Sequence, residues 1–376
     1  MTPLKTYFMI VSLSLSRCTV ILACDYNVRD AGFVDLGSAS YHLFGLVNKE
    51  TNVQIISGFS QIVGESLNAS NIKFELVDID RQKDHPVIGI VDSLQIKSFP
   101  SAVLVSPDGQ TMILALPNRA LFFKKQLKAI LQDILYSPKR YEIQKKIINA
   151  FAVVLFIEGT DRNENARARG AIVSANKKIA LQMKMMPKAI AHPPVIVTLT
   201  RDMFRQEDVL LWSLGLHRKT LVKPHVALIY GRARWVGPMF VGEKISAENL
   251  LSILYVIGQD CECGLDLSWV GGTMLPMQWN RKMESRLAKL LGFDPENPYV
   301  KMEVSRIIRR ERRSNPDVVT SAQILSDSQA VRKFADSSNE NTLRRTRISM
   351  SVFISIGFLL MLLLVGTTIY FKGRKK

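Results

Sequence analysis

The chain reads FPSAVLVSPDGQTMILAL at residues 99–116, and this stretch is its clearest structural signal. Apolar residues run from 102 to 105, and Thr111 begins a second run that is apolar from 112 to 116. Between them, Ser106-Pro107-Asp108-Gly109 places proline and glycine where a tight turn requires them. The stretch therefore predicts a hairpin of two antiparallel strands that begins directly after Phe99-Pro100.

Hydrophobic periodicity on both sides of this hairpin predicts the order strand, helix, strand, helix, strand, strand, helix. The upstream elements are a strand at 41–47, a helix at 52–67, a strand at 73–79 and a short helix at 87–94, and a helix at 118–135 follows the hairpin. The apolar spacing indicates that the two long helices bury Val53, Ile56, Phe59, Ile62 and Val63 in the first, and Leu121, Leu127, Ile130, Leu131 and Ile134 in the second.

The same order returns after a basic connector at 139–146. Apolar runs and caps predict, in turn, a strand at 151–157, a helix at 163–184, a strand at 195–199, a helix at 206–214, strands at 226–230 and 235–240, and a helix at 247–257 that Ser246 caps. Pro224 stands directly before the second hairpin, as Pro100 does before the first. An internal duplication explains this match.

The repeated unit resembles the thioredoxin-like superfamily, in which a cis-proline begins the third strand. Phe99-Pro100 and Lys223-Pro224 match that proline in position, and the resemblance covers residues 35–259. It implies an α/β chain of two tandem thioredoxin-like domains with two cis X-Pro bonds. It also implies a peptide-binding surface at Phe99, Pro100, Lys223 and Pro224.

The chain departs from the redox members of this family at the motif that carries their chemistry. Those members have Cys-x-x-Cys between the first strand and the first helix, where the helix N-terminus lowers the pKa of the attacking thiol. The corresponding residues 45–51 and 158–165 contain no cysteine. In this the two domains are similar to the non-catalytic domains of protein disulfide isomerases, which bind unfolded polypeptides or partner proteins, and we expect no enzyme activity from them.

Four cysteines occur in the chain, at Cys18, Cys24, Cys261 and Cys263. The last two could form a structural disulfide, act as a redox pair, supply thiolates to a metal or remain buried thiols. No second pair or nearby histidine completes a tetrahedral set, so we expect no metal site. The chain has no phosphate-binding loop or other cofactor motif, so we expect no cofactor.

The N-terminus carries a predicted export signal, because residues 7–16 are apolar or hydroxylic and a second apolar run covers 19–23. Ile21-Leu22-Ala23-Cys24 looks like an imperfect bacterial lipobox, which implies cleavage before Cys24 and lipidation of its thiol. Arg17 and Leu22 depart from that pattern. The alternative is an uncleaved anchor or an edge strand.

Residues 348–371 carry no charged side chain and would span about 36 Å as a helix, enough for a hydrocarbon core of about 30 Å. Basic residues flank both ends, and those at 372–376 favour a cytoplasmic C-terminus. With an export signal at the other end, this predicts a single-pass membrane protein whose domains lie outside the cytoplasm, in a periplasm or lumen. A tail-anchored protein with cytoplasmic domains is the alternative topology.

The formal net charge is +17, and basic side chains concentrate before the predicted membrane span. Five of them form one cluster, at Arg306, Arg309, Arg310, Arg312 and Arg313. Because the cluster lies close to a membrane anchor, anionic lipid headgroups or a solvated helix face are favoured over nucleic acid, which we do not expect as a partner.

These signals together predict the organisation of the chain. Its parts are a signal at 1–24, domains at 25–138 and 147–264, a helical extension at 265–313, a polar tether at 314–347, a transmembrane helix at 348–371 and a tail at 372–376. The predicted function is the binding of a polypeptide or a partner membrane protein by redox-inactive domains. The rival hypothesis is a thiol-disulfide oxidoreductase that uses Cys261 and Cys263.

Overall fold

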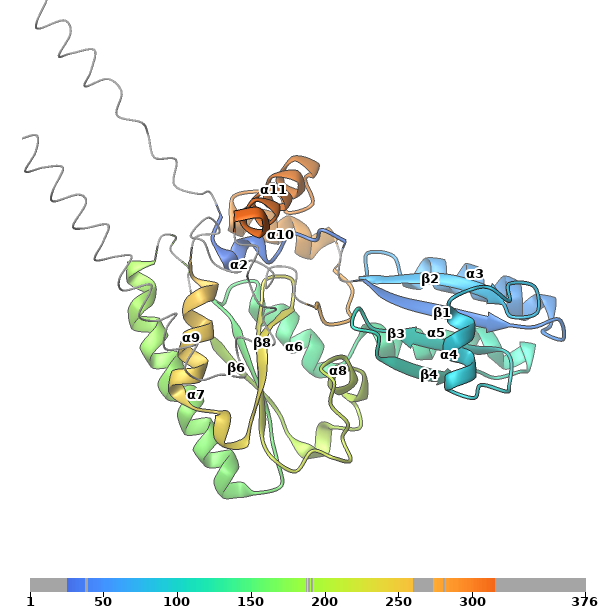
Figure 1. Ribbon diagram of the computed structural model, residues 1–376, viewed down its shortest axis with the longest axis horizontal. Coiled ribbons are helices and arrows are strands. Elements are labelled where there is room, and N and C mark those ends of the chain that lie inside the picture. Colours follow the sequence, from blue (N-terminus) through green and yellow to red (C-terminus); the bar gives the residue numbers. More distant parts are fainter. Residues whose placement is uncertain are drawn as a thin grey trace, which may run out of the picture. The chain divides into compact units, whose positions relative to one another are not determined.

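The computed structural model describes residues 26–37, 40–186, 188, 190, 192–259, 273–279 and 281–314, with only the backbone at 281 and 308–314 (Figure 1). The predictions about the export signal, the four cysteines, the tether and the span at 348–371 lie outside these residues. Among the described helices, none is both long enough and apolar enough to cross a membrane.

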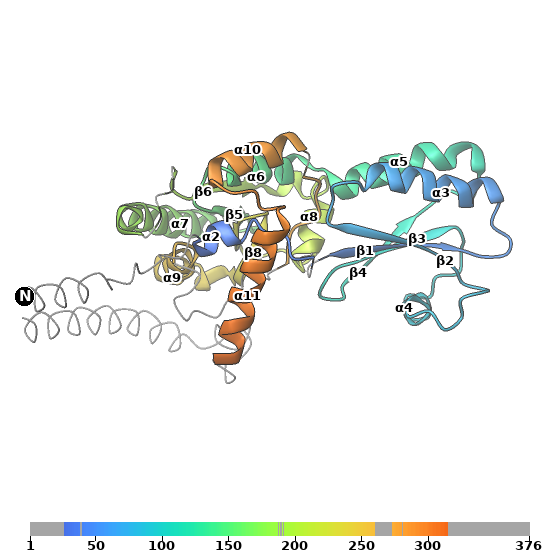
Figure 2. The same cartoon turned by 90° about the horizontal axis from the view of Figure 1, so that it is seen from above.

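The first sheet has four strands in the order β2-β1-β3-β4. β1 pairs in parallel with β2 and antiparallel with β3, and β3 pairs antiparallel with β4. Helices α3 and α5 cover one face of this sheet, and α4 covers the other (Figure 2). The bounds are β1 (Tyr41–Val47), α3 (Val53–Ser66), β2 (Ile72–Asp78), α4 (Val87–Ser93), β3 (Ser101–Val105), β4 (Thr111–Ala115) and α5 (Ala120–Leu135).

The second sheet repeats this arrangement in the order β6-β5-β7-β8, with the same strand directions. Its bounds are β5 (Val153–Ile157), α7 (Arg162–Gln182), β6 (Val195–Leu199), α8 (Asp208–Ser213), β7 (His225–Tyr230), β8 (Arg234–Val241) and α9 (Ala247–Ile257). Both units have the element order that the sequence predicted, and the two sheets share one strand order. The predicted α/β fold class with two tandem thioredoxin-like units is therefore confirmed.

Shorter or terminal helices complete the described chain. They are α2 (Val28–Ala31), α6 (Pro138–Ile147), α10 (Arg281–Leu291), α11 (Pro298–Ser314) and the 3₁₀ turns η1 (Met183–Met185), η2 (Arg201–Met203) and η3 (Gly242–Lys244).

Side chains at helix starts explain why several elements begin where they do. The Asn52 side chain accepts from the backbone N–H of Gln54 at the start of α3, and Ser246 accepts from Asn249 at the start of α9. Each cap satisfies a backbone donor that the first helical turn leaves without a partner. In the β3–β4 turn, Gly109 has φ +86°, a conformation that glycine adopts without strain.

The predicted inner faces of α3 and α5 are wrong at their first turns. Val53 is 77% exposed and Leu121 is 84% exposed, whereas Ile55 and Phe123 are buried. A side chain in the first turn of a helix is buried only if that turn lies over the sheet. The first turns of α3 and α5 lie at the end of the sheet, which leaves Val53 and Leu121 exposed. Periodicity alone does not show where a helix begins relative to the sheet beneath it.

The basic segment between the units, predicted as a connector, is helix α6 and belongs to the core of the second unit. Its Ile143 and Ile147 are fully buried among residues of β5, β6 and β7. Lys139, Lys145 and Lys146 lie on the partly exposed faces of the helix, whereas Arg140 is buried. Long basic side chains can cover an apolar helix face while their charged heads stay in water.

Residues 26–34, expected in the first domain, pack against the second unit. The Val28 amide donates to the carbonyl of Gln259 at 2.8 Å, and Phe33 is fully buried in the second core. A Cβ atom on Gly231 would collide with the backbone of Gly32, so the close approach requires glycine there.

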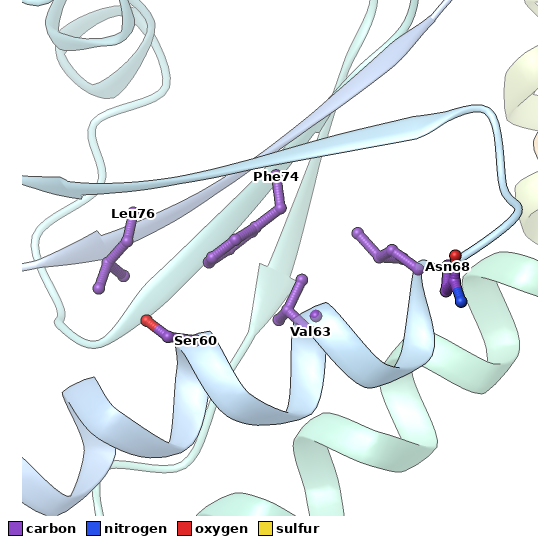
Figure 3. A pocket seen from close by; sticks show the side chains of 7 residues that line it. Ser60, Val63, Asn68, Phe74 and Leu76 are labelled. Carbon is purple, nitrogen blue, oxygen red and sulfur yellow. The ribbon is translucent and has the colours of Figure 1, made fainter.

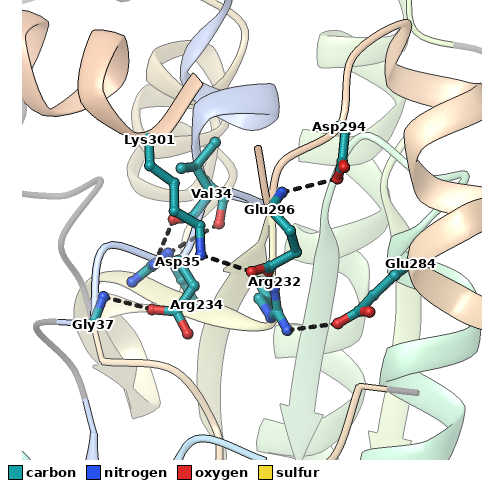
Figure 4. Close-up of polar contacts among 10 residues, drawn as sticks. Val34, Asp35, Gly37, Arg232, Arg234, Glu284, Asp294, Glu296 and Lys301 are labelled. Atoms are coloured by element: carbon teal, nitrogen blue, oxygen red, sulfur yellow. Dashed lines mark hydrogen bonds and ion pairs between the residues drawn. The ribbon is translucent and has the colours of Figure 1, made fainter. Parts of the chain in front are cut away.

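Two arginines of the β7–β8 turn fix the terminal segments (Figure 4). The guanidinium of Arg234 donates to two carbonyls of residues 32–34, each at 2.9 Å. Arg232 pairs with Glu284 of α10 at 3.3 Å and with Glu296, which precedes α11. The N-terminal segment and both C-terminal helices are thus held by the second unit.

Candidate functional site

Three loops of the first unit meet at one end of its sheet. In the strand register, Ser101 of β3 lies opposite Leu46 of β1 on one side and Ala115 of β4 on the other. The loops that continue from these positions, 48–52, 98–100 and 116–119, therefore emerge next to one another. This is the end at which the sequence placed Phe99 and Pro100.

The first of these loops occupies the position at which redox relatives carry their two cysteines, and it closes on itself. The Thr51 hydroxyl accepts from the Asn48 amide at 3.0 Å and donates to the Asn48 side-chain oxygen at 2.8 Å. The Lys49 amide donates to a carboxylate oxygen of Asp80 at 2.9 Å. The loop offers no thiol at the start of α3.

The Phe99-Pro100 bond is cis, as the resemblance implied. Pro100 is buried, and Phe99 is half-buried among the side chains that pack beneath α4. Within the part of the chain that the structure describes, no hydrogen bond is made by the backbone N–H or C=O groups of Ser98 and Phe99. These groups are available to an extended peptide, which binds as an added strand through main-chain hydrogen bonds of this kind.

Apolar side chains are exposed at the same end of the sheet, because Val53, Leu121 and Phe122 stand at the starts of α3 and α5. We call the loops 48–52, 98–100 and 116–119, with Val53, Leu121 and Phe122, the open end. The predicted site did not include these side chains. Their sequence signal was the run Leu121-Phe122-Phe123, since no single helix face can bury three consecutive residues.

The corresponding end of the second unit is closed by its own chain. Thr160 donates from its amide and its hydroxyl to the carbonyl of Val222, at 2.7 and 3.1 Å. The Gly242 amide donates to the carbonyl of Pro224 at 2.9 Å, and the Arg167 guanidinium donates to the Gly242 carbonyl at 2.7 Å. The three loops of this end are therefore tied together, and the Val222 carbonyl already has its partners.

The Lys223-Pro224 bond is not cis, so the expectation of two cis bonds is wrong. The loop after β5 lies directly against this peptide bond: a Cβ atom on Gly159 would stand 2.5 Å from the Val222 oxygen and 2.6 Å from the Pro224 nitrogen. The backbone at Lys223-Pro224 therefore packs against the loop after β5. The duplication does not depend on this bond, since both sheets have the same strand order.

A buried network of titratable groups lies between the two units. Ser137 donates to a carboxylate oxygen of Glu207 and accepts from Nε of Arg140, while Arg140 also donates to the carbonyl of Pro276 at 2.6 Å. Burial raises the pKa of Glu207 and lowers the pKa of Arg140 to about 10. All the hydrogen bonds named here are internal, so this network joins the segments 137–140, 207 and 276 and is structural.

A cavity of about 520 Å³ lies between α3 and the edge strand β2 (Figure 3). Val63, Leu67, Phe74 and Leu76 give it an apolar lining, and Ser60, Gly64 and Asn68 complete it. None of these side chains is ionisable or nucleophilic at neutral pH except the weakly reactive Ser60 hydroxyl, which has no base beside it in the lining. The cavity is therefore not a candidate active site.

The structure brings Phe99 and Pro100 together with the open end, and Lys223 and Pro224 with the closed end. Cys24, Cys261 and Cys263 lie outside the described residues. Across the described ranges, no group of three or more His, Cys, Asp or Glu side chains is arranged to hold a metal ion.

No protein-family model and no curated protein matches the chain. Among solved structures it is similar to the zinc-bound form of human ERp44, at 13% identity and a TM-score of 0.23, over 57% of this chain and 52% of that one. It is also similar to the first two thioredoxin domains of Saccharomyces cerevisiae Eps1p, at 11% identity and a TM-score of 0.21, over 58% of this chain and 92% of that one.

Full-length ERdj5 is a further similar structure, at 9% identity and a TM-score of 0.20, over 57% of this chain and 29% of that one. The match spans about half the length of ERp44. At these TM-scores the likeness supports no comparison of individual residues. The fold assignment rests on the strand order and directions of the two sheets.

Proposed function

We propose that this chain is a membrane-anchored, redox-inactive thioredoxin-like protein that binds an extended polypeptide or a partner membrane protein at the open end of its first unit. One observation carries the proposal. The backbone groups of Ser98 and Phe99 have no partner among the described residues, and Val53 and Leu121 are exposed at the same end of the sheet. An added strand could take hydrogen bonds from the first pair and apolar contacts from the second.

The second unit supports this choice by contrast. Its matching end is closed by Thr160 and Gly242, so Lys223 and Pro224 offer less to a ligand than Phe99 and Pro100 do. We propose that the role of the second unit is to support the fold and to hold the segments that lead to the membrane. It holds residues 26–34 and helices α10 and α11, which lead toward both predicted membrane attachments.

Redox inactivity is proposed because both positions that normally carry the catalytic thiols have other residues, Asn48 to Thr51 in one unit and Glu158 to Asp161 in the other. A thiolate needs a helix N-terminus or a nearby cation to be reactive at neutral pH. The remaining candidate pair is Cys261 and Cys263, which follows the last helix of the second unit. The oxidoreductase hypothesis therefore depends on that pair alone.

Anchoring and export are proposed from the sequence at both ends. Cleavage before Cys24 would leave every described residue in the mature chain, including the buried Tyr26 and Val28. The uncharged span at 348–371 would then cross the membrane with the tail at 372–376 in the cytoplasm.

The test of binding uses the purified full chain and a fluorescent, permanently unfolded probe, reduced and carboxymethylated α-lactalbumin. Because an acidic side chain would remove the apolar contacts, the double variant Val53→Asp, Leu121→Asp should bind this probe roughly ten-fold more weakly. The matched control is Tyr299→Asp on α11, where the native side chain is equally exposed and lies outside the open end. Equal binding by both variants would contradict the open end as the site.

The test of redox inactivity uses the same preparation with insulin as the substrate. We expect no reduction above background, and we expect the variant Cys261→Ser, Cys263→Ser to retain probe binding within about 1 kcal/mol. Turnover that is lost in this variant while the fold is kept would favour the oxidoreductase instead.

A further inference from the structure

Exposed apolar side chains occur in the last turn of α7, in η1 and in the last turn of α10. Leu181 is 73% exposed, Met185 is 81% exposed, and Leu290 is about half exposed. Large apolar side chains in contact with water are unfavourable, and a cluster of them marks a surface with a partner.

Lys188 shows that these segments lie close together. Its ammonium pairs with Asp30 of α2 at 2.6 Å, donates to the carbonyl of Leu291 at 3.3 Å and lies 5.6 Å from the centre of the Phe293 ring. Met185 precedes Lys188 by three residues, and Leu290 precedes Leu291 directly. Figure 1 shows the C-terminal end of α9 beside α2. The backbone amide of Val28 in α2 donates to the carbonyl of Gln259, two residues after α9.

Basic side chains stand within one helical turn of these apolar ones in the sequence. Lys177, Lys184 and Lys289 are exposed, and none of them has an ion pair with another described residue. Lys178, by contrast, pairs with Glu248 at 3.6 Å. We call Leu181, Met185, Leu290, Lys177, Lys184 and Lys289 the basic-apolar face.

The described chain begins at this face. Tyr26 donates to a carboxylate oxygen of Glu303 at 2.9 Å and packs edge-on against Phe293, whose ring also lies near Lys188. Cys24 stands only two residues earlier, so an acyl chain or an N-terminal anchor attached there would leave the protein beside the face. Two extended residues reach about 7 Å, so only a short length of chain separates Tyr26 from residue 24.

We propose that the basic-apolar face rests on an anionic phospholipid bilayer, with Leu181, Met185 and Leu290 entering the headgroup region and the three lysines beside acidic headgroups. Exposed apolar side chains combined with lysines are typical of surfaces that lie in a membrane interface. The proposal rests on the membrane attachment in the proposed function. It adds the surface of the folded protein that contacts the lipid.

The experiment places a photoreactive residue at one position of the full chain, which is reconstituted into vesicles and recovered by flotation. The substitutions are Met185→p-benzoylphenylalanine and, as the control, Leu121→p-benzoylphenylalanine, whose native side chain is as exposed but lies at the open end. After irradiation, mass spectrometry counts phospholipid adducts in phosphatidylglycerol vesicles and in phosphatidylcholine vesicles. We expect several-fold more adducts at 185 than at 121, and more with the anionic lipid.

A charge variant tests the part played by the lysines. Lys177→Glu, Lys184→Glu and Lys289→Glu together should lower the adducts at 185 several-fold, because acidic side chains repel the anionic headgroups. The matched control is Lys124→Glu, Lys125→Glu and Lys128→Glu on α5, which should leave them unchanged.

Each other outcome contradicts a defined statement. If the chain floats with the vesicles but residues 185 and 121 form equal numbers of phospholipid adducts, the lipid contact is overturned and the anchor stands. The same holds if residue 185 crosslinks only to protein. A chain that does not float with vesicles overturns the anchor in the proposed function and the lipid contact with it.

Discussion

Single glycine positions decide how tightly the ends of the two units close. Gly159 follows β5, where redox relatives carry cysteine, and its missing side chain allows the loop to lie against the Lys223-Pro224 peptide bond. The Thr160 amide and hydroxyl can then reach the Val222 carbonyl. In the first unit the corresponding loop bonds to Asp80 instead, and the backbone at Ser98 stays uncovered.

Gly159→Ala should therefore destabilise the protein. The new Cβ atom would meet backbone atoms of residues 222–224, which cannot move aside as a flexible side chain can, so we expect a loss of about 1–3 kcal/mol in the free energy of unfolding. Urea titration followed by circular dichroism measures it. Gly89→Ala in α4, where open space surrounds the glycine, should instead be neutral or stabilising by up to about 1 kcal/mol; equal losses in both variants would refute the steric explanation.

At the scale of elements, the short helix α8 belongs to two cores at once. Leu210 and Leu211 are buried in the second unit, while Trp212 is buried among residues of the first. The Trp212 ring lies 5.9 Å from the Tyr41 ring, and its indole N–H donates to the Thr111 carbonyl at 3.2 Å. A six-residue helix thus couples the two sheets.

Trp212→Ala should cost about 3–5 kcal/mol, because it removes a large buried ring from the first core and leaves a cavity. The loss of stability should affect mainly the first unit. Hydrogen exchange followed by mass spectrometry should show faster exchange in β1 and β4 than in β5 and β7, relative to the wild-type chain. Val222→Ala, at an exposed position, should change neither; uniform acceleration of both sheets by Trp212→Ala would argue against separate cores.

At the scale of the whole molecule, the two similar units have different surroundings. The second unit holds the N-terminal segment, α10 and α11 through Arg232 and Arg234, and its loop end is closed. Among the described residues, the first unit contacts residues 275–279 through Asn68, Ala69 and Asn71, and its loop end is open. In a duplicated fold, one unit can thus hold the terminal segments while the other unit binds a ligand.

The proposed topology predicts what protease should do to the chain in intact spheroplasts. Export, together with the uncharged span at 348–371, should leave the folded units accessible, so added protease should digest them and spare a short C-terminal fragment. A C-terminal epitope tag detects the fragment by immunoblot, and a cytoplasmic marker controls for intact cells. Full protection until lysis would contradict export and support the tail-anchored alternative.

Much of the candidate site could be predicted from local patterns. The turn at Ser106-Pro107-Asp108-Gly109 located the hairpin, and the hairpin located Phe99 and Pro100 at the end of the sheet. The exposed Val53 and Leu121 could not be predicted, since their position depends on where each helix starts above the sheet. The closed end could not be predicted either, because it depends on a contact between Gly159 and residues 222–224.

The sequence by itself determined the order of the strands and helices within each repeated unit, the duplication and the absence of thiols after β1 and β5, because periodicity, caps and turn residues act over a few neighbouring positions. Only the tertiary structure decided that α6 and residues 26–34 join the second core, and that one loop end is open while the other is closed. These outcomes depend on close contacts between segments far apart in the chain, such as Gly32 with Gly231, and no local pattern encodes which distant segments will fit together.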